Sequence, residues 1–195
     1  MLRIVLIRPG TTDYDVEERI QGALDIPLNA QGLSEVAALV DQLKGQGIET
    51  IYASPSQPAR QTSEILAKGL GLRVKRLVRM KNLDHGLWQG LPIGEVRHKQ
   101  PKVYRQWQEQ PENVCPPEGE MLSQAQERVR ACLGKLLRRH KEGVVVAMVV
   151  PEPLASLVRH FVKNDELGDL WKALGSHGRW EILEVEPVQA PAMTH

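Results

Sequence analysis

Short apolar runs alternate with amphipathic stretches along most of this chain, and that alternation constrains the fold more than any other feature. Residues Arg3 to Ile7 read RIVLI and stop at Pro9-Gly10, which is typical of a buried strand followed by a sharp loop. Between positions 33 and 43, apolar side chains recur at helical spacing. The pattern predicts a three-layer αβα sandwich around a mostly parallel sheet.

The other elements follow from the same periodicity. The run Val144 to Val150 is the most apolar, so we expect it at the centre of the sheet. We expect one domain over 1–186, with a helical cap inserted at about 92–120 and a flexible tail at 187–195. The remaining predicted strands and helices are strands at 50–53, 73–77 (at an edge) and 180–185, and helices at 33–43, from 54 to about 69, 121–140 and 154–161.

Composition excludes several classes of protein. The chain has 195 residues, 42% of them hydrophobic and 25% charged, as expected of a globular domain rather than a disordered or collagen-like chain. No apolar run approaches the roughly 20 residues of a membrane span. The net charge of +1 gives no argument for nucleic acid, and two cysteines are too few for a disulfide framework or a zinc site. We expect a cytoplasmic protein without a cofactor or metal.

Three loops follow the carboxyl ends of predicted strands, where parallel sheets bind their ligands. They cover residues 8–19, 54–60 and 151–153. We expect them to meet at one edge of the sheet and to form a binding pocket there.

Five segments in and around these loops carry a family resemblance. They are IRPGTTDYDVEERIQGALDIPL (7–28), SPSQPARQT (54–62), NLDHGLWQG (82–90), PPEGE (116–120) and VAMVVPEP (146–153). In this order, over residues 2 to about 185, the chain resembles the histidine phosphatase, or phosphoglycerate-mutase-like, superfamily. The resemblance implies transfer of a phosphoryl group through a nucleophilic histidine. A second histidine and two arginines would surround that group, and a glutamate would serve as general acid.

Four of those positions depart from the family pattern. Pro9 stands for the nucleophile, Pro58 for the second arginine, Asn82 for the general acid and Glu152 for the second histidine. Proline offers no nucleophilic side chain, and an amide does not titrate. Arg8 remains, and we expect it to form an ion pair with Glu152.

These losses predict a pseudoenzyme, a non-catalytic domain that binds a small molecule or a protein. Any protein partner would contact residues 92–114, while the basic residues of 128–141 fall on several helical faces and indicate a solvated surface. The expected ligand-binding residues are Arg8, Gly10, Thr12, Asp15, Gln21, Gly22 and Glu152.

The alternative is a phosphatase or phosphomutase that acts on a small phosphomonoester with relocated catalytic residues. Of six histidines, His85 and His177 lie in loops that could approach the pocket, although the simpler interpretation of each is a solvent-facing side chain. An acidic cluster in the first loop, residues 13–18, could hold a divalent metal through carboxylate oxygens. Its simpler interpretation is a solvated loop.

Overall fold

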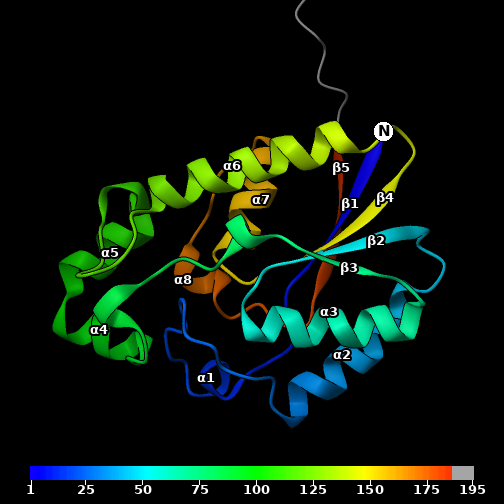
Figure 1. The fold of residues 1–195 in the computed structure, drawn as a ribbon. Helices are drawn as coiled ribbons and strands as arrows, with labels where there is room; N and C mark the ends of the chain where they lie inside the picture. Colours follow the sequence, from blue (N-terminus) through cyan, green and yellow to red (C-terminus); the bar gives the residue numbers. More distant parts are fainter. Residues whose placement is uncertain (186–195) are drawn as a thin grey trace, which may run out of the picture.

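Five strands form a single sheet in the order β3-β2-β4-β1-β5, in a computed structural model that describes residues 1–185 (Figure 1). Strands β1 to β4 run parallel to one another, and β5 pairs antiparallel with β1. The predicted fold class and the central place of β4 are therefore confirmed. The strands are β1 (Leu2–Ile7), β2 (Ile48–Ala53), β3 (Val74–Arg76), β4 (Val145–Val149) and β5 (Trp180–Val185).

Helices cover both faces of this sheet (Figure 1). The two on one face are α2 (Ala30–Leu43) and α3 (Gln57–Leu70), and those on the other are α6 (Leu122–Arg139) and α7 (Leu154–Lys163). Successive side chains of a strand point to opposite faces. In β1, Val5 packs into the core beneath α2 and α3, whereas Ile4 and Leu6 pack into the core beneath α6 and α7.

The connections beyond the carboxyl ends of the strands hold the remaining elements. Residues 92–120, the predicted cap, contain two helices and a 3₁₀ turn, as shown at the left of Figure 1. These connecting elements are α1 (Asp13–Val16), α4 (Ile93–Lys99), α5 (Pro101–Glu109), α8 (Leu170–Ala173), and the 3₁₀ turns η1 (Val78–Met80), η2 (Gly86–Trp88) and η3 (Pro111–Asn113).

Several predicted boundaries need correction. Helix α2 begins at Ala30 rather than Leu33, because the Asn29 side chain accepts a hydrogen bond from the Gly32 amide at 2.9 Å and caps the helix. Strand β3 has three residues rather than five. The predicted tail at 187–195 lies outside the described residues. Within 1–185, no helix combines the length and apolar character needed to cross a membrane.

Gly32 lets the start of α2 lie directly against the first loop. A Cβ atom at this position would lie 2.1 Å from the Thr11 carbonyl oxygen, so the backbone would have to move. We expect Gly32→Ala to lower the free energy of unfolding by about 1–3 kcal/mol, measured by urea denaturation. Gly94→Ala is the control, because its Cβ would meet nothing within 4 Å. Equal stability of the two variants would contradict the packing argument.

Candidate functional site

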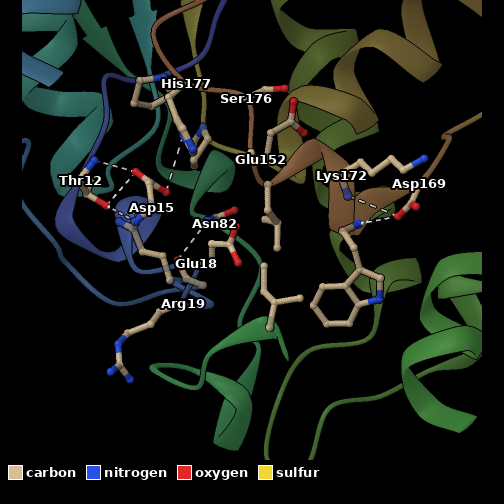
Figure 2. A pocket seen from close by; sticks show the side chains of 18 of the residues that line it. Thr12, Asp15, Glu18, Arg19, Asn82, Glu152, Asp169, Lys172, Ser176 and His177 are labelled. Carbon is tan, nitrogen blue, oxygen red and sulfur yellow. Dashed lines mark hydrogen bonds and ion pairs between the residues drawn. The ribbon is translucent and has the colours of Figure 1, made fainter. Parts of the chain in front are cut away.

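The predicted loops meet at a cavity of about 580 Å³ beyond the carboxyl ends of the strands. Its walls include Thr12 and Glu152 from those loops (Figure 2). Gly10, Pro58 and Pro151 of the same loops also line it. The cap and the segment 169–177 complete the wall. The other lining residues are Pro9, Asp15, Glu18, Arg19, Gln21, Gly22, Asn82, Ile93, Gly94, Arg97, Tyr104, Gln108, Asp169, Trp171, Lys172, Leu174, Gly175, Ser176 and His177.

The expected ligand-binding residues all line this cavity except Arg8. The Arg8 guanidinium donates to Glu152 Oε1 through Nε at 2.9 Å and to Glu181 Oε1 through Nη1 at 2.7 Å. The predicted Arg8–Glu152 pair is therefore confirmed. Burial alone would lower the pKa of Arg8, but the charges and hydrogen bonds of the two carboxylates outweigh it and raise that pKa. Arg8 is thus a structural cation.

Glu152 is fixed from its other oxygen as well. Its Oε2 accepts hydrogen bonds from the backbone amide of Ser156 at 3.1 Å and from the Ser156 hydroxyl at 2.7 Å. The side chain is 4% exposed. A buried carboxylate needs such a full set of donors. Glu152 therefore supplies negative charge to the wall and holds Arg8 in place.

Asn82 also has its polar atoms occupied. Its Nδ2 donates to the Gly22 carbonyl at 3.0 Å, and its Oδ1 accepts from the Leu83 amide at 2.9 Å. The side chain therefore links the motif at 82–90 to the motif at 7–28. Asn82 lines the cavity and supports the Gly22 turn, where φ is +55°.

A histidine does reach the cavity, but from a segment outside the motifs. His177 lies between α8 and β5, and its Nδ1 is 3.6 Å from Asp15 Oδ1 (Figure 2). The expectation that His177 faces solvent is wrong, because the Gly178 amide donates to the Pro9 carbonyl at 2.8 Å and holds this loop over the first one.

Asp15 is held rigidly beneath the ring. Its Oδ2 accepts from the Thr12 amide at 2.7 Å and from the Thr12 hydroxyl at 2.8 Å. The side chains of His177 and Asp15 are 21% and 14% exposed, so both are partly shielded from water. Asp15 therefore places a fixed carboxylate 3.6 Å from Nδ1 of His177, on the wall of the cavity.

Three long basic side chains line the cavity in addition to His177. Arg19 contacts Glu17 and donates to the Gly90 carbonyl, and Arg97 lies over the Tyr104 ring at 5.9 Å. Lys172 is exposed and has no acidic partner within 4 Å in residues 1–185. Sequence analysis missed Arg97 and Lys172, because only the folded cap and α8 bring them to the strand ends.

The acidic residues of the first loop do not converge on a common point. Asp13 accepts a hydrogen bond from Asn29, Asp15 accepts from Thr12, and Glu17 pairs with Arg19. Glu18 lines the cavity, and its backbone adopts φ of +53°, a left-handed conformation that is uncommon outside glycine. The first loop therefore presents separate carboxylates rather than a shared ligand set.

His85 lies away from the cavity, in the core. The residue is 1% exposed, and neither ring nitrogen has a hydrogen-bond partner in the described residues. The expected solvent-facing position is wrong, because α5 places Trp107 edge-on against the ring at 5.4 Å. Burial lowers the pKa of His85 to about 4, although Asp84 and Glu120 act in the opposite direction.

His85 should make stability depend on pH. Between pH 6.5 and about 4, the unfolded chain holds a proton on His85 that the folded chain does not. The free energy of unfolding therefore decreases as the pH is lowered from 6.5 to about 4, by on the order of 3 kcal/mol. Urea denaturation at pH 7 and pH 4.5 measures the effect. His85→Leu is expected to lose this share of the pH dependence, and an unchanged slope in that variant would contradict the assignment.

The chain has named relatives of the same overall size. It is 27% identical to phosphoserine phosphatase 1 of Hydrogenobacter thermophilus over 186 residues, covering 95% of this chain and 88% of that protein. It is 31% identical to the probable phosphoglycerate mutase GpmB of Yersinia enterocolitica over 137 residues, which are 70% of this chain and 64% of the mutase. The latter match thus spans less than two thirds of that protein.

Solved structures show the same similarity. The mycobacterial glucosyl-3-phosphoglycerate phosphatase Rv2419c superimposes with a TM-score of 0.82 and 27% identity, over 93% of this chain and 92% of the other. YhfR of Bacillus stearothermophilus gives a TM-score of 0.83 at 27% identity, over 95% and 92%. The expectation of a non-catalytic domain is wrong on these comparisons, because similar proteins are named as phosphatases or mutases.

The family itself is shown by a match along nearly the whole chain. The family model described as "Histidine phosphatase superfamily (branch 1)" matches residues 4–192. That span includes all five motifs, the cap and the loop that carries His177. The chain therefore belongs to branch 1 of the histidine phosphatase superfamily.

Proposed function

We propose that this protein is a phosphatase acting on a small phosphomonoester, with His177 as its nucleophile. The observation that carries the proposal is the His177–Asp15 pair on the wall of the cavity, 3.6 Å apart. An imidazole with a carboxylate beside one ring nitrogen can attack phosphorus through its other nitrogen. The relatives named as phosphatases support the class of reaction.

The reaction proceeds in two steps in this proposal. Nε2 of His177 attacks phosphorus, the ester P–O bond breaks, and the alcohol leaves with a proton from solvent. Water then attacks the phosphohistidine, releasing phosphate and restoring the ring. Phosphoryl transfer depends mainly on positioning and charge neutralisation. Lys172 and Arg97 take the phosphate-binding role here, since Arg8 is occupied by two carboxylates.

The cap at about 92–120 selects the substrate in this proposal, within a single domain over 1–186. Its support is that Ile93, Arg97, Tyr104 and Gln108 line the cavity. Tyr104 stacks on Trp171 with ring centroids 5.0 Å apart and planes at 7°, which fixes the outer wall. A cytoplasmic location is also part of the proposal and is supported by the free thiols of Cys115 and Cys132.

The test is hydrolysis by repurified protein at high concentration. Phosphoserine, 3-phosphoglycerate and p-nitrophenyl phosphate are the substrates, with release of inorganic phosphate as the measurement. Brief incubation with ³²P-labelled substrate should leave acid-labile, base-stable label on the protein, as expected for phosphohistidine. Turnover no higher than that of the heat-denatured protein, on all three substrates, would overturn the proposal.

A further inference from the structure

Basic side chains from two distant segments gather on one surface beside the edge of the sheet. The segment 73–81 reads RVKRLVRMK and contains no acidic residue. The chain leaving β3 passes beneath α6 (Figure 1). The "basic surface" defined here consists of exposed residues from 73–81 and from the second half of α6. They are Arg73, Lys75, Arg76, Arg79, Lys81, Lys135 and Arg139.

Two shared neighbours show that the segments face each other. The Tyr52 hydroxyl is 2.8 Å from His140 Nε2, and Lys75 lies over the Tyr52 ring at 5.7 Å. Burial lowers the pKa of His140, and the charges of Lys75 and Arg139 lower it further, whereas Glu49 acts in the opposite direction.

Hydrogen bonds from Arg128 connect α6 to the segment 73–81. Its Nη1 donates to the carbonyl oxygens of Arg79 at 2.8 Å and Lys81 at 2.6 Å, and its Nε donates to Glu120 at 2.7 Å. The guanidinium is thereby occupied from both sides. The basic surface is therefore held on a fixed backbone rather than on a free loop.

The charges of the basic surface are not neutralised within the described part of the chain. None of its seven members has an acidic partner within 4 Å in residues 1–185. The whole chain has 25 Lys and Arg and 24 Asp and Glu. Without the seven residues of the basic surface, the chain has 18 Lys and Arg against 24 Asp and Glu. The near-neutral net charge therefore combines a positive region on this surface with an excess of acidic residues elsewhere.

Strand β3 adds an open backbone edge to this surface. The Arg73 carbonyl accepts from Ile51, and the Leu77 amide donates to Ala53, so these residues pair with β2. By the alternation of a strand, Val74 and Arg76 direct their backbone groups away from β2. All three residues of β3 are exposed, and the Val78 side chain beyond it is 73% exposed.

We propose that the basic surface and the outer edge of β3 bind an acidic, extended segment of another protein. The segment would add a strand to the sheet through the backbone groups of Val74 and Arg76 that point away from β2, while its carboxylates meet the basic side chains. The aromatic ring beneath, Tyr52, is 2% exposed and provides no stacking platform for unpaired bases. An extended acidic polypeptide therefore fits this surface better than single-stranded nucleic acid.

The test uses a fluorescein-labelled decapeptide of alternating Glu and Val, with binding measured by fluorescence anisotropy at 50 and 300 mM salt. We expect Lys75→Glu with Arg79→Glu to raise Kd at least tenfold. Lys102→Glu with Arg105→Glu, two exposed basic residues of α5 outside the basic surface, is the charge-matched control and should leave Kd unchanged. A peptide with Pro in place of each Val should also bind at least tenfold more weakly, because proline has no N–H to donate.

Three outcomes would overturn the proposal. Absence of binding would mean that the lysines and arginines only protect an open edge. Equal binding of the Pro-containing peptide would exclude strand addition. Tighter binding of a ten-nucleotide single-stranded RNA than of the Glu-Val peptide would assign the surface to nucleic acid. Unchanged thermal unfolding and phosphatase turnover would show that the Lys75→Glu, Arg79→Glu variant is folded.

Discussion

Replacing His177 with alanine is expected to reduce phosphatase turnover by at least about a hundredfold, with little effect on stability. The side chain removed is 21% exposed and lies on a cavity wall, so its loss leaves no void in the core. Since the ring acts on the phosphoryl group in the transition state, kcat should fall much more than KM rises. Acid-labile phosphate labelling should disappear in the same variant.

Asp15 and His98 give graded controls for this prediction. Asp15→Asn keeps the size of the side chain but removes the charge beside Nδ1, so its loss of turnover should be smaller than that of His177→Ala. His98→Ala removes an exposed histidine from α4 and should leave turnover unchanged. If His177→Ala retains wild-type turnover after repurification, the nucleophile lies elsewhere and our assignment is wrong.

The second large effect concerns stability. Glu152→Ala is expected to lower the free energy of unfolding by about 3 kcal/mol, because it leaves the partly buried Arg8 with one carboxylate and Ser156 without its acceptor. Urea denaturation provides the measurement. Arg8→Met should have a cost of similar size, since Glu152 would then be a buried carboxylate without its cation.

The double variant separates a coupled pair from two independent contributions. With both charges removed, neither Arg8 nor Glu152 is left without its partner, and we expect the combined cost to be well below the sum of the single costs. Simple additivity would contradict the view that Arg8 and Glu152 act as one unit.

The sequence allowed the fold and the location of the cavity to be predicted, for reasons that lie in particular residues. The run Val144 to Val150 is apolar throughout, and the parallel arrangement then brings residues 8, 54 and 151 to the same sheet edge. The Arg8–Glu152 pair followed from neighbouring strand ends with opposite charges. These inferences need only local pattern and topology.

The positions of the histidines could not be predicted in this way. His177 reaches the cavity through one tertiary hydrogen bond, from the Gly178 amide to the Pro9 carbonyl, in a segment without a motif. His85 is buried because Trp107 comes from the cap, 22 positions further along the chain. Periodicity carries no information on such contacts. The misjudged function has a different cause: the missing motif residues argued for a non-catalytic domain, whereas similar proteins are named as phosphatases or mutases.

The second partner of Arg8 sets a condition for engineering this scaffold. Returning the four motif positions to the family pattern would place His at 9 and 152, Arg at 58 and Glu at 82. Arg8 would still donate to Glu181 at 2.7 Å, and Glu181 belongs to β5, outside every motif. A designer who wishes to restore the phosphohistidine pocket must therefore also change β5, for example by Glu181→Gln, before that arginine is released for phosphate.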